Sequence, residues 1–474
     1  MRRILIRAGM LPNESFDYIE MIRRNLLGDN VGNLVYQYSI VRMLMNDEGG
    51  VEFIPTRYRY HFSPQEIDVF NETCECFVIP LANAFRESFI PELKGLTELV
   101  KALKIPCYVI GVGVQASIDE TKFDFSFNGD VRDFAEAVLQ KSAIIGVRGQ
   151  ITADYLTKLG FVPEKDFTVI GCPSMYARQE LSVRGADITS ASDIAYNISP
   201  GADAMTIQYV RRNAGTFHSA VYIPQNLGDL KLVYAGITRK AKKEFPGELC
   251  DPSVDEAAFP GSVVAWKALL QTKSLSFGTR LHGNIMGVLS GIPTIHIPFD
   301  ARTSELVSYH ELVCANRKDV ENGVPILELA GRMDFQKPVR VQKRNFEHYM
   351  DFLDANGISH IDPSVSEAPL DRMLRETVFP EPLRSIRQAE REEVLKRATT
   401  YSNYANQRII DQNAKLASEE KKLEKQKADR KKIKELEQKL REKNEAIEAL
   451  KAENDRLRNE SLWDTWKRKT WCAR

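Results

Sequence analysis

The sequence has no net charge, no long apolar run and few cysteines. Its 65 Lys and Arg residues balance 65 Asp and Glu residues, so no bulk charge draws the chain toward nucleic acid. No stretch approaches 18 uninterrupted apolar residues, and the start of the chain turns polar too early for a signal peptide. Seven cysteines, an odd number scattered over 474 residues, argue against a disulfide framework. We therefore expect a cytoplasmic protein that binds no nucleic acid.

Motifs for metals and for nucleotide cofactors are also missing. The seven histidines are dispersed without a His-Glu-x-x-His arrangement, and Cys74-x-Cys76 lacks the ligand spacing of a zinc site. Gly111-Val-Gly113 lacks the third glycine and the downstream acidic residue of a dinucleotide fingerprint. We expect no metal, no nicotinamide cofactor and no nucleotide hydrolysis.

The body of the chain, from residue 1 to about 360, alternates short β-branched runs with helical patterns, which is typical of parallel sheets joined by crossover helices. The predicted strands before a polar gap at 181–193 are 3–7, 76–80, 107–111, 143–147 and 168–171. Those after the gap are 195–198, 220–224, 274–277 and 294–297. We predict an α/β protein with two Rossmann-like lobes, 1–180 and 190–360, and a ligand cleft where the carboxyl ends of the strands meet.

The remainder of the chain has a different composition. It contains neither Gly nor Pro after Pro382, and about 26 of the 42 residues in 419–460 are charged. We predict a helical connector at 361–412 and a coiled coil at 413–461. Six apolar side chains follow a three-four alternation, with Asn454 at an "a" position that favours in-register dimers, although Lys443 occupies a "d" position. The six are Ile433, Leu436, Leu440, Ile447, Leu450 and Leu457. A homodimer is expected, and a solvated single helix is the alternative.

The last segment, 462–474, holds three of the four tryptophans beside a Lys-Arg-Lys cluster. On a helix, Trp463, Trp466 and Trp471 would share one side, while the basic residues attract anionic headgroups. This segment is expected to make peripheral contact with the inner face of the plasma membrane. Docking onto the body or onto a partner protein is the alternative.

The most informative segment for chemistry lies between 276 and 295, where a strand ends, a glycine turn follows and a helix begins. Arg280 and His282 stand at that turn, where helix N-terminal amides and a guanidinium favour an anion. His282 can transfer a proton near neutral pH, and Gly283 leaves room for a ligand. The alternative is structural: a buried histidine satisfied by backbone, and an arginine paired with a carboxylate.

Thr279-Arg-Leu-His-Gly283, followed by Leu289-Ser-Gly-Ile-Pro-Thr-Ile295, resembles the motif of the polysaccharide pyruvyl transferase family. Four further stretches and a final cleft loop also resemble motifs of this family, in the same order along the chain. They are Gly28-Asp-Asn-Val-Gly-Asn33, Ile110-Gly-Val-Gly-Val114, the stretch 145–160 that begins Ile-Gly-Val-Arg, Ile223-Pro-Gln225, and Pro298-Phe-Asp-Ala-Arg302. The resemblance covers about 60% of the chain. The chain departs from the family pattern at Asn33, where Asp is usual, near Asp300, where the usual Lys is absent, and at Cys172-Pro-Ser174, where an Asp-Pro pair is common.

The resemblance implies a fold similar to the GT-B glycosyltransferases. It also implies transfer of pyruvate from phosphoenolpyruvate to two hydroxyls of a glycan or glycan precursor, forming a cyclic ketal and releasing phosphate. The acceptor is a saccharide, with a lipid-linked precursor as one option. Phosphoenolpyruvate is a donor substrate, so no cofactor is expected.

The resemblance assigns catalytic roles to His282, as the proton-transfer residue, and to Arg280. Arg148 and Arg280 would clamp the donor across the cleft. Backbone amides of Gly283 and Asn284 would face the departing phosphate. The other substrate-binding residues it implies are Gly111, Gly113, Asn30, Asn33, Asp300 and Arg302. Two rival hypotheses are a GT-B glycosyltransferase that uses a nucleotide sugar, and a non-catalytic scaffold in glycan synthesis.

Overall fold

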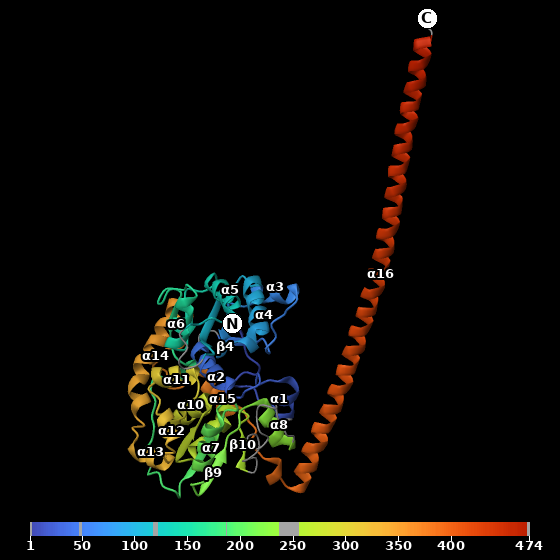
Figure 1. Ribbon diagram of the computed structural model, residues 1–474. Helices are drawn as coiled ribbons and strands as arrows, with labels where there is room; N and C mark the ends of the chain where they lie inside the picture. Colours follow the sequence, from blue (N-terminus) through green and yellow to red (C-terminus); the bar gives the residue numbers. More distant parts are fainter. Residues whose placement is uncertain (1, 47–49, 117–121, 186, 237–255, 472–474) are drawn as a thin grey trace. The chain divides into compact units, whose positions relative to one another are not determined.

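The computed structural model describes residues 2–46, 50–116, 122–185, 187–236 and 256–471, and the chain divides into two compact units (Figure 1). The body is Met1–Thr399 and the tail is Thr400–Arg474. Among the described residues, no helix is both long and apolar enough to span a membrane.

The first lobe of the body is built on a sheet of seven parallel strands, ordered β2-β1-β3-β5-β6-β7, with β4 paired to β5. The strands are β1 (Arg2–Ile6), β2 (Val51–Pro55), β3 (Cys76–Pro80), β4 (Asn83–Phe85), β5 (Cys107–Val114), β6 (Ile145–Val147) and β7 (Phe167–Val169). Every residue of β3 and β5 is buried, as expected for parallel strands covered by helices on both faces. The helices are α1 (Tyr18–Arg24), α2 (Asn33–Leu44), α3 (Pro64–Thr73), α4 (Ile90–Ala102), α5 (Asn128–Leu139) and α6 (Gln150–Lys158), with the short 3-10 helices η1 (Glu87–Phe89) and η2 (Pro173–Ala177).

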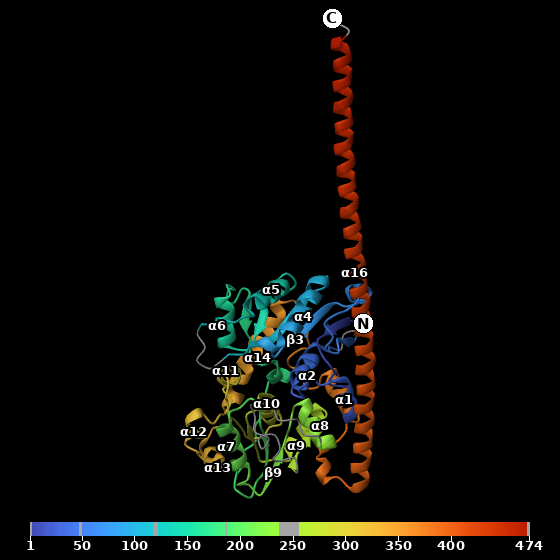
Figure 2. The same ribbon diagram turned by 45° about the vertical axis from the view of Figure 1, so that its right-hand side comes forward.

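The second lobe has a sheet of four parallel strands in the order β12-β11-β8-β9. The strands are β8 (Asp193–Asn197), β9 (Ser219–Tyr222), β11 (Leu275–Gly278) and β12 (Thr294–His296). The helices are α7 (Ala204–Ala214), α8 (Leu227–Ala235), α9 (Val263–Gln271), α10 (Leu281–Leu289), α11 (Ala301–Tyr309), α12 (Arg317–Glu321) and α13 (Ile326–Arg332). In both views α4, α5 and α6 lie at the opposite end of the body from α7, α12 and α13 (Figure 1, Figure 2).

The two sheets confirm the predicted fold class of two Rossmann-like lobes, and all nine predicted strands are present with ends shifted by at most three residues. Two strands of the first sheet were not predicted. β2 is a half-buried edge strand without a continuous apolar run, and β4 has only three residues. A short antiparallel pair, β10 (Ala258–Phe259) with β13 (Leu383–Arg384), was also not predicted.

The chain returns to the first lobe after the second sheet. Helix α14 (Lys337–Ala355) falls in the range expected for the second lobe, yet it packs against β6 and β7. His348 bonds Thr168 at 3.2 Å, and the Asn356 side chain bonds the backbone of Ile144. The remaining elements are α15 (Pro369–Glu376), η5 (Ile386–Gln388) and the charged helix α16 (Arg391–Trp471). Helix α16 runs through the segments predicted as coiled coil and Trp-rich end, while the side chains of 457–474 lie outside the described residues.

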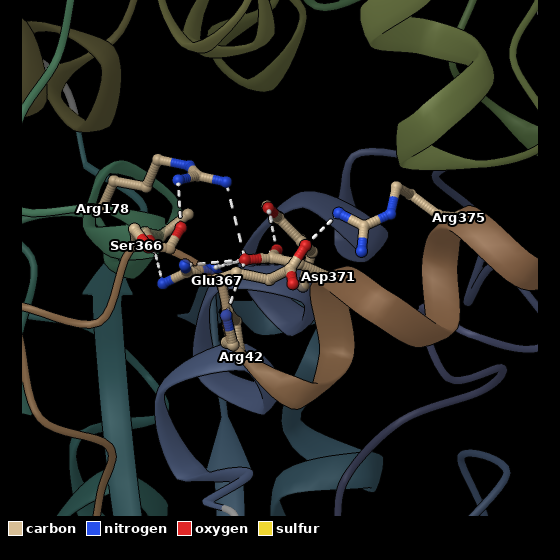
Figure 3. Close-up of polar contacts among 9 residues, drawn as sticks. Arg42, Arg178, Ser366, Glu367, Asp371 and Arg375 are labelled. Carbon is tan, nitrogen blue, oxygen red and sulfur yellow. Dashed lines mark hydrogen bonds and ion pairs between the residues drawn. The ribbon is translucent and has the colours of Figure 1, made fainter.

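A buried ion pair fastens α15 to α2 and η2 (Figure 3). Arg42 on α2 makes a bidentate contact with Asp371 on α15, at 3.0 and 2.8 Å to Oδ2, and donates to the Ala177 carbonyl at 2.6 Å. The two charged side chains are only 3% and 11% exposed. Arg178, directly after η2, adds a longer contact of 3.5 Å to Asp371. This pair therefore links α15 to α2 and to the end of η2.

Candidate functional site

A cavity of about 730 Å³ lies between the lobes, where strands of both sheets end. Its walls include residues that follow β1, β3, β8 and β11 within two positions. Five of the residues predicted for the site line it: Asn30, Asn33, Arg280, His282 and Arg302. A cavity of this size at the carboxyl ends of parallel strands suits a small-molecule substrate.

The turn between β11 and α10 is held by a network beneath it. Gly278 adopts a φ of +150°, and a side chain there would meet the Asn197 carbonyl at 2.1 Å. The Asn197 side chain accepts from the Arg280 N–H at 2.7 Å and donates to Asn284 at 2.8 Å. Asn284 in turn donates to the Gly278 carbonyl at 2.7 Å. The network fixes where Arg280 and the start of α10 face.

This network corrects two expectations for the start of α10. The Asn284 N–H, expected to face phosphate, donates instead to the Arg280 carbonyl, and the Asn284 side chain is buried. The space beside Gly283 is taken by Gln225 and Asn197, because a Cβ there would lie 2.3 Å from Gln225 Nε2. A side chain at 283 would crowd the buried Gln225 and Asn197 side chains, so the glycine lets α10 pack closely against them.

His282 lies in the first turn of α10 and faces the first lobe. Its Nε2 is 3.9 Å from Cys172 Sγ, and its ring centroid is 5.7 Å from that of Tyr36. A Cβ at Gly32 would lie 2.9 Å from His282 Nδ1, so the early glycine turn packs directly against the imidazole. The histidine is thus positioned by residues of both lobes.

The electrostatic surroundings of His282 are cationic. Burial holds the pKa of His282 well below its usual range, and three nearby guanidinium groups push it in the same direction. They belong to Arg148, Arg302 and Arg280. The imidazole is neutral at pH 7 in the unliganded site. A bound anion would offset the cations and raise this pKa.

Arg148 lies beneath the cavity rather than in its wall. Its side chain is 1% exposed, and it donates to the Gly111 carbonyl at 2.5 Å and to the Leu81 carbonyl at 3.4 Å. A side chain at Gly113 would meet Arg148 Cδ at 3.1 Å, and Gly111, at φ +79°, packs against Pro173. Burial lowers the pKa of Arg148. Arg148, Gly111 and Gly113, which were expected to contact the donor, therefore lie in a layer behind the cavity wall. From there the charge of Arg148 lowers the pKa of His282.

Arg280 and Arg302 are the predicted cations that do reach the cavity. Arg280 Nε donates to the Ile198 carbonyl at 3.0 Å, and its Nη2 lies 3.9 Å from Asp229. Arg302 pairs with Asp300 at 3.3 Å. Asp300 also accepts from the Thr303 N–H at 2.8 Å and so caps α11. Asp300 therefore caps α11 and positions Arg302 through the ion pair.

The early glycine turn joins the two lobes. Asn30 accepts from the Gly32 N–H at 2.7 Å and lies 3.4 Å from Asn226 of the second lobe. Asn33, at the usual Asp position of the family, donates to the carbonyls of Leu27 and Gly28 and accepts from Tyr36. An aspartate could not make those two donations, so the amide suits this turn.

Sequence reasoning missed several residues of the site. Arg7, Tyr36, Tyr58, Tyr60 and Arg86 line the cavity from the first lobe. They belong to no motif, and the one available signal was that Arg7 is the last residue of a predicted strand. Glu305 of α11 was also missed: it accepts from the Thr152 N–H and hydroxyl, both at 3.2 Å, and joins α11 to the start of α6. Burial raises the pKa of Glu305 to about 7.

The fold and the site define a two-lobed α/β protein with a cation-rich cavity between its lobes. The sequence model of the polysaccharide pyruvyl transferase family matches residues 30–300, more than half of the chain. The chain belongs to this family, and the resemblance found in its motifs is confirmed.

Solved structures with a similar fold have low sequence identity to this chain. The UDP-GlcNAc 2-epimerase of Methanocaldococcus jannaschii is 10% identical to this chain. The match covers 75% of this chain and 100% of the epimerase chain, with a TM-score of 0.43. The UDP-GlcNAc 2-epimerase of Neisseria meningitidis is also 10% identical, with the same coverage and a TM-score of 0.39. The glycosyltransferase SnogD of Streptomyces nogalater is 12% identical, covers 75% and 99%, and has a TM-score of 0.28. No curated protein matches the sequence.

Proposed function

We propose that the protein transfers pyruvate from phosphoenolpyruvate to two hydroxyls of a saccharide, forming a cyclic ketal and releasing phosphate. The observation that carries the proposal is the meeting of Arg280, Arg302 and His282 at one cavity in a member of this family. Phosphoenolpyruvate carries a carboxylate and a phosphate, and guanidinium groups bind both with planar, charge-assisted hydrogen bonds.

The chemistry assigns His282 a proton transfer. Protonation of the donor's methylene carbon creates an oxocarbenium-like centre at C2, which one saccharide hydroxyl attacks. The second hydroxyl then displaces phosphate and closes the ketal ring, and the two hydroxyl protons leave to solvent or phosphate. Because the free imidazole is neutral, His282 acquires its proton when the anionic donor offsets the surrounding guanidinium charges.

The first test is a thermal-stability titration of the full chain with phosphoenolpyruvate and, separately, with a panel of nucleotide sugars, since a ligand that prefers the native state raises the melting temperature. We expect saturable stabilisation by phosphoenolpyruvate. Arg280→Ala should weaken it by roughly 10- to 100-fold, the effect of losing charge-assisted hydrogen bonds. Arg317→Ala is the matched control, because Arg317 is exposed on the same lobe and paired with Asp203.

Stabilisation by a nucleotide sugar alone would replace the proposal with a glycosyltransferase. Stabilisation by neither ligand would favour a non-catalytic scaffold. Equal loss of affinity in Arg280→Ala and Arg317→Ala would remove Arg280 from the donor site.

The role of His282 predicts a separation of binding from turnover. His282→Ala should lower the rate of phosphate release in the presence of a saccharide acceptor by about 10²- to 10⁴-fold, while the affinity for phosphoenolpyruvate changes little. His218→Ala, an exposed histidine of the second lobe, is the control. Near-normal phosphate release by His282→Ala would exclude it as the proton-transfer residue.

A further inference from the structure

A second group of cationic side chains lines the cavity from the first lobe, outside every family motif. Arg7 directly follows β1, and Arg86 directly follows β4. Both line the same cavity as Arg280, His282 and Arg302. The proposed function uses Arg280 and Arg302 for the donor's carboxylate and phosphate, and it gives the two first-lobe arginines no part in donor binding.

Arg7 is a buried cation that no carboxylate contacts among the described residues. It is 7% exposed, and its guanidinium donates to the Pro80 carbonyl at 3.1 Å and to the Tyr60 hydroxyl at 2.9 Å. The guanidinium carbon lies 5.0, 5.7 and 5.4 Å from the ring centroids of Tyr58, Tyr60 and Phe89. Its Nε is buried and has no hydrogen-bond partner in the described part of the chain. The aromatic rings offset part of the charge, but the planar fork keeps an unused donor beside the cavity.

Arg86 lies close to other cations. Its Nε donates to Ser88 at 3.0 Å, its Nη1 donates to the Asn83 carbonyl, and the guanidinium carbon lies 5.3 Å from the Phe89 ring centroid. Burial lowers the pKa of Arg86, and the charges of Arg302 and Arg7 lower it further.

Two carboxylates also line this part of the cavity. Glu92 raises the pKa of Arg86 and so opposes the effects on it of burial and of the two arginines, but it does not outweigh them. Asp29 is exposed and bonds Asn25. The surroundings of Arg86 therefore remain electropositive.

Tyr36 lies close both to His282 and to Arg7. Its ring is 5.7 Å from the His282 ring, and its hydroxyl lies within electrostatic range of Arg7. Tyr36, Tyr58 and Tyr60 line the same cavity, and their rings can pack against the C–H faces of a sugar. We call the part of the cavity lined by Arg7, Arg86, Tyr58 and Tyr60 its tyrosine-lined end.

We infer that the acceptor saccharide carries an anionic substituent, a carboxylate or a phosphate, which Arg7 and Arg86 bind at the tyrosine-lined end of the cavity. The inference rests on the proposed function, because it assigns the acceptor of the same reaction. It specifies the acceptor class: an acidic or phosphorylated sugar is bound, and the matching neutral sugar is disfavoured because both guanidinium groups would stay uncompensated.

The test uses matched pairs of probes with the full chain at saturating phosphoenolpyruvate. Galactose is compared with galacturonate, and N-acetylglucosamine with N-acetylglucosamine 1-phosphate, by calorimetric titration. At least one anionic member should bind about ten-fold or more tightly than its neutral partner, the effect of one charge-assisted hydrogen bond. The galacturonate arm tests a carboxylate and the 1-phosphate arm tests a phosphate.

Two variants test whether Arg7 and Arg86 cause the preference for the anionic sugar. Arg7→Gln and Arg86→Gln should each reduce it to less than about three-fold, while the affinity for phosphoenolpyruvate changes by less than about three-fold. Arg86, which is only partly buried, keeps the test usable if Arg7→Gln fails to fold. Arg59→Gln is the control, because Arg59 carries the same charge outside the cavity and pairs with the exposed Glu66.

Equal binding of charged and neutral sugars would overturn the inference. So would a large loss of phosphoenolpyruvate affinity in Arg7→Gln together with competition between the donor and the anionic sugar, which would place these arginines in the donor site. Failure of phosphoenolpyruvate itself to bind would instead reject the proposed function, and the sugar pairs would then be compared without it.

Discussion

At the residue scale, Glu305 shows how burial makes one side chain sensitive to pH. It is 6% exposed between α11 and α6, and burial raises its pKa to about 7, above the value of an unfolded chain. The protonated acid is therefore favoured in the folded state. This stabilising contribution is fully present below the unfolded pKa, near pH 4.5, and is lost as pH rises through about 7.

Replacement of Glu305 by glutamine should remove this pH dependence. The amide oxygen can still accept from the Thr152 N–H, so the variant and the wild type should have similar free energies of unfolding near pH 4.5. Above pH 7 the variant should be more stable by up to about 3 kcal/mol, the equivalent of the raised pKa. Urea unfolding at pH 5 and pH 8 measures the difference. A difference that is the same at both pH values would show that Glu305 does not titrate in this range.

Individual side chains were also where sequence reasoning reached its limit. The motif was enough to predict that Arg280 and His282 lie at the site, because a strand end, a turn and a helix start are local features. The positions of Arg148 and Asn284 depended on partners from distant strands, the Gly111 carbonyl for Arg148 and the Asn197 side chain for Asn284. Arg7 and Arg86 were missed because only the tertiary structure brings the ends of β1 and β4 to the cavity that the motif also lines.

At the element scale, the contact of α15 with α2 and η2 depends on one buried charge pair (Figure 3). Asp371→Ala would leave Arg42 buried without its counterion, and the free energy of unfolding should fall by about 3–5 kcal/mol. Glu367→Gln removes the partner of Arg375 in an exposed pair, where the change should stay below about 1 kcal/mol. Chemical denaturation of the two variants compares them directly.

The double variant Arg42→Met, Asp371→Leu distinguishes an unpaired charge from lost packing. It should recover most of the stability that Asp371→Ala loses, because apolar side chains of similar volume can replace a buried ion pair. A double variant as unstable as Asp371→Ala would mean that the hydrogen bond from Arg42 to Ala177, rather than the charge pair, holds this contact.

Elements with strong local patterns were predictable and those defined by tertiary contacts were not. The buried runs of β3 and β5 were evident because parallel strands covered on both faces are continuously apolar. Edge strand β2 carries Glu52 and is half-buried, so its pattern resembled a loop. The return of α14 to the first lobe could not be read from its sequence, because an amphipathic helix shows which face is apolar but not which sheet covers it.

At the scale of the whole molecule, the tail unit carries a row of exposed apolar side chains, which we call the apolar stripe. Within the single chain, Ile433, Leu436, Leu440, Ile447 and Leu450 are between 49% and 65% exposed. They follow the heptad spacing that buries such residues against a second helix, with Asn454 at an "a" position. Self-association through this stripe would remove five apolar side chains per helix from water, and we propose a homodimer for that reason.

The dimer is testable with charges placed on or off the stripe. Ile447→Lys with Leu450→Lys should convert a dimer of full-length chains into a monomer, measured as a halved mass by sedimentation equilibrium, because four lysines would face one another across the seam. Ala452→Lys adds the same kind of charge at an outward "f" position and should leave the dimer intact. If the wild-type chain already sediments as a monomer across micromolar concentrations, the helix stands alone in water. Its many charged side chains, including the Lys451–Glu448 pair at 2.8 Å, would then be what stabilises it.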